Sequence, residues 1–472
     1  ATEEGSLGMR LALRIARAAT DRDRDGHSAL FGGGDCDDRR ADTFPGADDV
    51  PGDGVDQNCE GGDARAIAAA EEDPTPPPTE KVPPRADAFA GNVLVISIDA
   101  LRADRLGVAG YGRPAGTSLT PNLDALAKRG AYFKRVWAQA PNTPRSFPSF
   151  LTSRWPADVA WEKRSLNYSP ILPSNDTFFE GLARAGLRPI GVFSHFYFTR
   201  DRGIDQGFAE WTNDGAGTIA ESNKDIASPR VVPRVIERLR KAAASKERFV
   251  LWTHLFEPHS SYMAHPEFPT KESGVAGLQE KYDYEIAFAD RWIGKLLAAL
   301  DETGLAANTA VLVHADHGEA WGEHRHYFHG QDLTEEQLRV PLILAVPGRA
   351  PAVIDDDVAL VDVGPTLLDL VGAPVPGSYR GRSLLPLVLG QPLPPRPLFA
   401  ELLPATAWPK HETVLLEGGW KITHKITERR WELHDLRNDP GQMRDMSREP
   451  GETAAIFERM KARLLAFEET RR

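Results

Sequence analysis

Two carboxylates stand where buried strands of the chain are expected to end. Residues 92–98 form a short apolar run that predicts a buried strand, and Asp99 follows it directly. Residues 309–315 form a second such run, which is followed by Asp316 and His317. Ligands of open α/β sheets bind outside the carboxyl ends of the strands, and a carboxylate beside an imidazole is a plausible metal pair. The simpler alternatives are an aspartate that caps a turn and a structural histidine.

The histidines are gathered in one part of the sequence. Nine of the 13 histidines fall between His195 and His329. An isolated histidine is more often structural than functional, but this cluster accompanies two carboxylates at separate strand ends. The stretch from His254 to His259 also follows an apolar run, at residues 248–253, which predicts another buried strand. Clustering by chance is the weaker explanation.

A hydroxyl group stands at the start of a predicted helix. Thr143 precedes Pro144, and proline is favoured in the first turn of a helix. A hydroxyl there meets the positive end of the helix, where a tetrahedral oxyanion binds most readily. The same residues also form a common turn, so the pattern alone leaves both interpretations open.

Two further helices are predicted around these strands. One begins with Thr120 as its N-cap and ends at Gly130. The other covers about residues 282–300, where apolar side chains recur at helical spacing.

The composition is that of a soluble globular protein, with 41% hydrophobic and 26% charged residues. The chain has 472 residues, a length that predicts about two to four domains. A net charge of −12 without an offsetting basic stripe argues against nucleic acid as the main partner.

The N-terminal segment predicts a short helix. Leu7, Leu11 and Ile15 recur at helical spacing with arginines between them. A packing helix is the simpler interpretation, and a segment that follows a membrane anchor upstream of Ala1 is the alternative. No apolar run of the sequence is long enough to span a bilayer.

Residues 21–63 form an acidic island. Three aspartates occupy alternate positions just before a glycine: Asp21, Asp23 and Asp25. Carboxylates spaced by two can converge on one hard cation if the backbone turns at the glycine. Without a cation, dense acidic charge would keep the segment a flexible arm.

The island resembles the small calcium-binding repeats of bacterial exported proteins. The motifs DxDxDG, GDCDD and PGxDxxxDGxDxNC occur in the order typical of that family. The resemblance implies calcium held by Asp21, Asp23 and Asp25, and a disulfide between Cys36 and Cys59. Since a disulfide needs an oxidising compartment, we expect a periplasmic or extracellular protein.

A proline-rich segment at residues 64–90 follows the island. It cannot sustain a helix or a strand and predicts an extended, semi-rigid linker. The predicted organisation is therefore an N-terminal helix and calcium-binding module at residues 1–63, the linker, and a main domain at residues 91–472.

The main domain resembles the sulfatase family of the alkaline phosphatase superfamily. An ordered set of motifs carries the resemblance: the strand that ends in Asp99, TPNLDALA, SFLT before WP, DHGE followed by GEH, RVPLIL, and the closing ELHDLRNDP. It covers about residues 91–465. It implies an α/β fold with a mostly parallel sheet between helices, and a smaller C-terminal antiparallel subdomain from about residue 395.

The resemblance also implies a role for individual residues. The positions that match ligands of a divalent metal (Ca, Mn, Mg or Zn) are Asp99, Asp316 and His317, and the position of the nucleophile is Thr143. The positions that match catalytic histidines are His259, His324 and His329, and those that match substrate-binding residues are Arg145 and His195. Thr143 is placed by counting back from the SFLT motif. A rival register makes Ser146 the nucleophile, but it shifts the downstream match by three residues.

Three departures from the family pattern bear on the substrate. The main domain has no cysteine from which a formylglycine could be made, and Ala100 stands where many sulfatases have a second aspartate ligand. The stretch at residues 191–195 lacks the lysine of the family's glycine-lysine-tryptophan-histidine motif. The departures resemble the phosphotransferase and phosphodiesterase branches of the superfamily.

Three functions are compatible with this sequence. The favoured one is a metal-dependent ester hydrolase with a covalent threonine intermediate, acting on a small-molecule, glycan or lipid ester, with phosphate preferred over sulfate. The alternatives are a phosphotransferase that uses the same intermediate and a non-catalytic protein that binds an anionic glycan. The sequence does not indicate an oligomeric state.

Overall fold

The computed structural model describes residues 7–31, 33–44, 47, 53–57, 59, 88–112, 118–214, 226–406 and 409–471. Most of the predicted linker at residues 64–90 lies outside this part of the chain. Within the described residues, no helix is long and apolar enough to cross a membrane.

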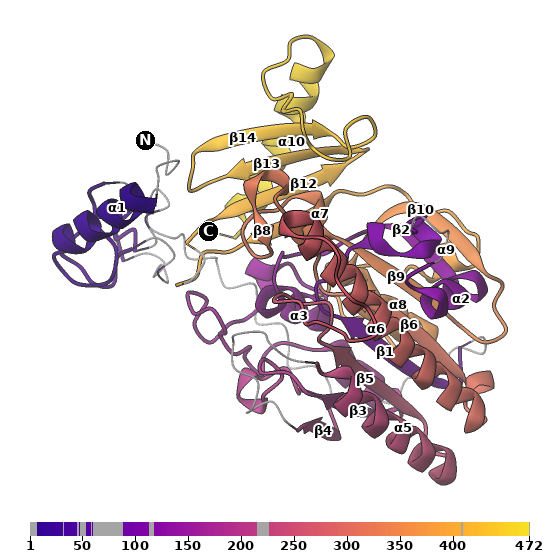
Figure 1. Cartoon of the computed structure of the whole chain (residues 1–472). Helices are drawn as coiled ribbons and strands as arrows, with labels where there is room; N and C mark the ends of the chain where they lie inside the picture. The colour runs from indigo at the N-terminus through magenta and orange to yellow at the C-terminus, as the bar shows by residue number, and fades with distance from the viewer. Residues whose placement is uncertain are drawn as a thin grey trace.

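The main domain is built on an eight-stranded sheet (Figure 1). Its strands are β1 (Asn92–Ile98), β2 (Ala131–Trp137), β3 (Arg188–Phe193), β4 (Glu210–Asn213), β5 (Phe249–Leu255), β6 (Thr309–Ala315), β9 (Arg339–Ala345) and β10 (Ala352–Ala359). They lie in the order β10-β2-β9-β6-β1-β5-β3-β4. Only β9 runs antiparallel to its neighbours, so the sheet is mostly parallel, as predicted.

Helices pack against the sheet in two groups. Helix α6 contacts both α2 and α5, and α3, α4 and α8 form the second group. Their bounds are α2 (Pro121–Arg129), α3 (Thr143–Thr152), α4 (Phe178–Arg184), α5 (Ser228–Ser245), α6 (Gly274–Glu302) and α8 (Val363–Leu370), with the short helices α7 (Glu335–Leu338) and α9 (Leu385–Val388) nearby. Every residue of the central strands β1, β5 and β6 is buried, so both faces of the sheet are covered.

The start of α3 is fixed by aromatic packing and by a cap. Phe147 and Phe150 lie against Trp252 of β5, with ring centroids 5.2 and 6.1 Å away. Such pairs add about 0.5–1.5 kcal/mol each beyond the burial of their area. Asn142 is the N-cap, and its side chain accepts a hydrogen bond from the backbone N–H of Arg145. Thr143 is therefore the first helical residue, at the carboxyl edge of the sheet.

A second, antiparallel sheet forms the C-terminal unit. Its strands are β11 (Leu398–Leu402), β12 (Glu412–Glu417), β13 (Trp420–Lys425) and β14 (Arg430–Asp435), and helix α10 (Glu452–Glu469) packs on it. Strand β14 covers the beginning of the closing motif that the sequence analysis singled out. The buried Lys425 pairs with Asp332 at 2.8 Å, and this ion pair joins the sheet to the loop that follows β6.

The N-terminal segment forms helix α1 (Leu7–Thr20) followed by the acidic loops of the island. Thr20 at the end of α1 lies 2.8 Å from the hydroxyl of Ser28, so the helix is tied to the loop that follows it. Cys36 and Cys59 form the disulfide that the resemblance implied.

Candidate active site

The pairing of two strands brings the predicted metal ligands together. Strands β1 and β6 run parallel with Ile98 opposite Ala315, so the residues that follow them, Asp99 and Asp316, leave the sheet side by side. Both carboxylates are fully buried. One oxygen of Asp316, Oδ1, accepts hydrogen bonds from the backbone N–H groups of Ala100 and His317, at 3.3 and 3.1 Å. Its other oxygen has no hydrogen-bond partner among the described residues.

His317 directs a lone pair at these carboxylates. Its Nδ1 donates to the carbonyl oxygen of Gly318 at 2.9 Å, so the neutral ring has no hydrogen on Nε2. That nitrogen lies 3.5 Å from Oδ1 of Asp99 and 3.5 Å from Oδ2 of Asp316. Oδ1 of Asp99 is likewise without a hydrogen-bond partner in the described part of the chain. Two carboxylate oxygens and one imidazole nitrogen thus converge, a donor set that fits a divalent cation.

The charges of this group are strongly coupled. Burial raises the pKa of Asp316, and the neighbouring charge of Asp99 raises it further. Burial would also raise the pKa of Asp99, but His259, His195 and His254 together hold it well below its usual range. At least one buried carboxylate therefore stays ionised and carries negative charge into the site.

The hydroxyl of Thr143 lies beside the candidate metal ligands. Its Oγ1 lies 3.1 Å from Nε2 of His317, and the hydroxyl lowers the pKa of the adjacent Asp316. Ser146, the rival nucleophile, donates its hydroxyl hydrogen to the backbone carbonyl of Asp316 at 2.7 Å. This geometry favours Thr143 as the nucleophile and leaves Ser146 to tie α3 to the loop that follows β6.

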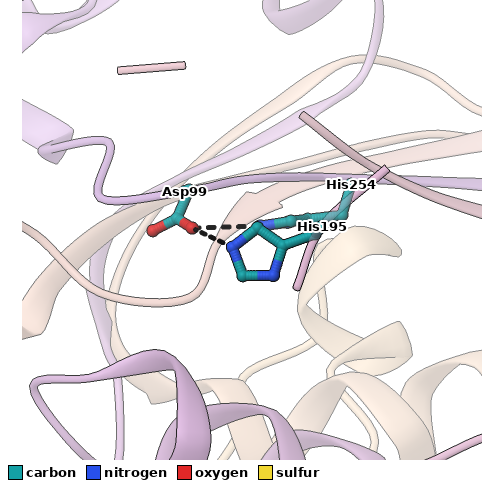
Figure 2. Close-up of side chains that lie close together, drawn as sticks. All are labelled: Asp99, His195 and His254. Atoms are coloured by element: carbon teal, nitrogen blue, oxygen red, sulfur yellow. Dashed lines mark hydrogen bonds and ion pairs between the residues drawn. The ribbon is translucent and has the colours of Figure 1, made fainter. Parts of the chain in front are cut away.

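Two histidines face the same oxygen of Asp99 (Figure 2). Nε2 of His254 is 3.2 Å and Nε2 of His195 is 3.5 Å from Oδ2 of Asp99. Both rings are buried, since His254 belongs to β5 and His195 follows the neighbouring β3. The sequence predicted His195 as a substrate contact, and its position against Asp99 favours an orienting role instead.

Two more histidines complete the group. The ring of His329 lies 4.3 Å from that of His317 and 4.6 Å from that of His259, measured between centroids. Nδ1 of His329 is 3.1 Å from Oε1 of the buried Glu319. Burial alone would lower the pKa of His329, but Glu319 raises it above its usual value. Burial lowers the pKa of His259 to about 3, so this ring is neutral.

Residues 91–373, more than half of the chain, match the sulfatase family. The chain belongs to this family. Residues 322–470 also match a family described as the C-terminal region of N-sulphoglucosamine sulphohydrolase. The choline-sulfatase of Rhizobium meliloti (strain 1021) is 26% identical over 439 residues, which cover 76% of this chain and 83% of the relative. Arylsulfatase K of Canis lupus familiaris is 33% identical over 155 residues, or 32% of this chain and 29% of the relative.

Solved structures with this fold include enzymes of two reaction types. A 2-O glycosaminoglycan sulfatase superposes with a TM-score of 0.67 at 18% identity, over 81% of this chain and 92% of that one. The phosphonate monoester hydrolase of Silicibacter pomeroyi superposes with a TM-score of 0.66 at 20% identity, over 81% and 96%. The alkaline-phosphatase-like fold is confirmed, and this member of the sulfatase family is a hydrolase of ester bonds.

Two other predicted site residues make contacts of a different kind. Both ring nitrogens of His324 are used: Nδ1 lies 3.1 Å from Glu336, and Nε2 lies 3.3 Å from the carbonyl of Gln442. The guanidinium of Arg145 donates to the carbonyls of Arg164 and Leu166 and lies on the ring of Trp161. Both nitrogens of His324 are thus occupied, which favours a packing role. Nη1 of Arg145 is buried without a hydrogen-bond partner in the described part of the chain, so its contact with substrate stays a prediction.

The acidic island forms a second candidate metal site. The carboxylates of Asp21, Asp23 and Asp25 lie together, as predicted. Asp35, which the sequence analysis did not assign, lies near them: burial, together with the charges of Asp25 and Asp23, raises its pKa to about 6. In the described residues, Oδ2 of Asp23, Asp25 and Asp35 is buried without a hydrogen-bond partner. Residues 35–64 match a family described as a metal-binding motif.

Calcium is predicted to bind this island and to hold its loops together. The site offers only carboxylate oxygens, the ligands that Ca²⁺ prefers, and without a cation these charges repel one another. Asp35→Asn is expected to weaken Ca²⁺ binding to the full chain by on the order of tenfold, as measured by calorimetry. Asp42→Asn is the matched control, because Asp42 is exposed and pairs with Arg40. Identical limited proteolysis of the island with and without chelator would contradict the prediction.

Proposed function

We propose that this sulfatase-family chain hydrolyses phosphate esters through a covalent intermediate on Thr143. One observation carries the proposal: Oγ1 of Thr143 lies 3.1 Å from Nε2 of His317, beside two buried carboxylate oxygens that lack hydrogen-bond partners in the described part of the chain. The main domain also contains no cysteine, so its nucleophile is not a formylglycine made from one.

Asp99, Asp316 and His317 would hold the divalent cation. When bound, it supplies positive charge that lowers the pKa of a nearby hydroxyl and neutralises the oxygens of the reacting ester. Thr143 stands at the first position of α3, where the helix terminus favours negative charge on the ester oxygens.

The proposed reaction has two steps, in which Thr143 is the nucleophile and His329 transfers the proton. The Thr143 hydroxyl gives its proton to solvent and Oγ1 attacks phosphorus, so that a Thr143–phosphate bond forms as the bond to the leaving oxygen breaks. His329 gives its proton to that oxygen, and Glu319 stabilises the charged imidazole beforehand. Water then attacks phosphorus and passes a proton to the neutral His329 as the Thr143–phosphate bond breaks. Thr143 takes a proton back from solvent, and a monoester yields inorganic phosphate as the second product.

The chemistry of a threonine ester supports phosphate over sulfate. A formylglycine hydrate releases sulfate by breaking its own carbon–oxygen bond, because a second hydroxyl on that carbon lets it collapse to the aldehyde. A threonine ester has no such hydroxyl, so water must attack at sulfur or phosphorus. The stretch at residues 191–195 lacks the family's lysine, and one fewer positive group faces the anion.

Matched nitrophenyl substrates test this preference. We expect kcat/KM for the phosphate monoester or the phosphodiester to exceed that for the sulfate by about 100-fold, which corresponds to about 2.7 kcal/mol. The three substrates share one leaving group, so the comparison isolates the transferred group. A higher kcat/KM for the sulfate would refute the proposed substrate class.

The disulfide supports a location outside the cytoplasm. Cys36 and Cys59 are bonded, and such bonds persist in oxidising compartments. We therefore propose that the enzyme works in the periplasm or outside the cell.

A further inference from the structure

The two oxygens of Asp99 have different surroundings. Oδ2 lies 3.2 Å from Nε2 of His254 and 3.5 Å from Nε2 of His195 (Figure 2). Oδ1 faces Nε2 of His317 at 3.5 Å and has no hydrogen-bond partner among the described residues. The carboxylate thus turns one oxygen toward two histidines and the other toward the metal ligands.

One hydrogen bond of His195 fixes the tautomer of its ring. Its Nδ1 accepts a hydrogen bond from the backbone N–H of Tyr197 at 3.1 Å. A neutral imidazole with an accepting Nδ1 has its hydrogen on Nε2, and that hydrogen faces Oδ2 of Asp99. Since Nε2 has no free lone pair in this tautomer, His195 is not a ligand of a second metal ion.

A chain of hydrogen bonds gives His254 the same tautomer. The indole N–H of Trp252 donates to Oγ of Ser97 at 2.9 Å, and this oxygen lies 3.0 Å from Nδ1 of His254. The other acceptor for the Ser97 hydroxyl, the carbonyl of Thr253, is farther away at 3.3 Å. Ser97 therefore donates to Nδ1, and Nε2 of His254 donates to Asp99.

Packing prevents the His254 ring from turning away. Phe147 meets it edge-on and Phe198 stacks on it, each with its ring centroid 5.0 Å away. Because the ring lies in a close-packed core, its Nε2 stays directed at Oδ2 of Asp99.

We propose that His254 and His195 restrict Asp99 to one-oxygen coordination, and that the catalytic site thereby selects a first-row transition-metal ion over Ca²⁺ and Mg²⁺. Asp316 is restricted in the same way, since its Oδ1 is bonded to two backbone N–H groups. Ca²⁺ takes six to eight oxygens, often through bidentate carboxylates, and Mg²⁺ also prefers oxygen, whereas an imidazole nitrogen suits ions such as Mn²⁺ and Zn²⁺. The inference rests on the metal centre of the proposed function and names its metal class.

Metal binding by the purified full chain tests this selectivity directly. Each of Mn²⁺, Zn²⁺, Ca²⁺ and Mg²⁺ is titrated into chelator-treated protein, with bound metal measured by elemental analysis after dialysis. Asp99→Asn serves as the reference, because it removes the catalytic site and leaves the acidic island intact. We expect the Asp99-dependent site to take one equivalent of Mn²⁺ or Zn²⁺ and to bind Ca²⁺ and Mg²⁺ more weakly.

Substitutions at His254 separate an orienting role from a structural one. His254→Leu is expected to weaken Mn²⁺ and Zn²⁺ binding by about 10–100-fold and to reduce the preference over Ca²⁺, since Asp99 is then free to use both oxygens. His254→Gln keeps an N–H donor and is expected to recover most of the affinity. His265→Leu, at a buried histidine in another loop, is the control and should leave both affinities unchanged.

Three results would overturn the proposal. They are tighter Asp99-dependent binding of Ca²⁺ or Mg²⁺ by the unaltered protein, unchanged selectivity in His254→Leu, or a second transition-metal equivalent that disappears in both His254→Leu and His195→Leu. These are binding measurements, so they hold whether or not phosphate esters are turned over. Normal metal binding without phosphate-ester hydrolysis would refute the proposed function and leave this assignment standing.

Discussion

Replacing Thr143 with alanine is expected to lower kcat/KM for phosphate esters by at least about 10³-fold, because the nucleophile is lost. The folded structure should persist: the substitution removes a hydroxyl, whose contact with His317 contributes about 1 kcal/mol, and one buried methyl group, which contributes about 0.8 kcal/mol. Steady-state kinetics measures the loss, and circular dichroism with thermal unfolding shows whether the protein remains folded.

Ser146→Ala is the matched control for this prediction. Ser146 lies one helical turn from Thr143 and donates to the backbone carbonyl of Asp316. Its loss leaves that buried carbonyl unpaired and is expected to cost about 1–3 kcal/mol of unfolding free energy, while most of the activity remains. An inactive Ser146→Ala together with an active Thr143→Ala would show that the nucleophile had been misplaced by three residues.

The candidate metal ligands could be picked out because strand ends obey a simple geometric rule. Asp99 and Asp316 each follow a continuous apolar run, and the carboxyl ends of neighbouring parallel strands meet at the same edge of a sheet. The sequence does not say which strands are neighbours, and the pairing of β1 with β6 in the structure brings the two aspartates together. The apolar runs and the order of the family motifs thus pointed to the same two aspartates.

The orienting residues could not be predicted in the same way. His254 lies inside β5, where alternation places a side chain on one face but does not say which strand end it reaches. It contacts Asp99 only because β5 lies beside β1 with His254 opposite Ser97. Asp35 was missed for a similar reason, since its approach to Asp23 depends on how distant loops of the island fold together.

The loop after β6 shows why its histidines were hard to distinguish. A short hairpin of β7 (Ala320–Trp321) and β8 (Tyr327–Phe328) turns at residues 322–326. It returns His329 to the metal ligands, while His324 in the turn reaches Glu336 and Gln442. From sequence spacing alone, His324 and His329 are equally good candidates for a catalytic histidine. The path of the hairpin determines which of them lies at the site.

Substitution of His329 is expected to slow the hydrolysis of poor leaving groups far more than that of good ones. His329→Gln should lower kcat/KM for an alkyl phosphate by about 10²–10⁴-fold, because an alkoxide needs a proton as it departs. Nitrophenolate leaves without that proton, so the nitrophenyl ester should lose about tenfold or less. The slope of log kcat/KM against the pKa of the leaving group, measured over a series of esters, should steepen in the variant.

The partner of His329 gives the prediction its pH dependence. Despite burial, Glu319 raises the pKa of His329, so the acidic form persists to higher pH. Alkyl-ester hydrolysis should therefore fall as pH rises through the raised pKa. In Glu319→Gln that fall should begin at a lower pH, since the stabilising carboxylate is gone.

His324→Gln is the control, because its contacts with Glu336 and Gln442 predict no change in leaving-group dependence. A steeper slope in His324→Gln, or in His259→Gln but not His329→Gln, would assign the proton to that histidine instead.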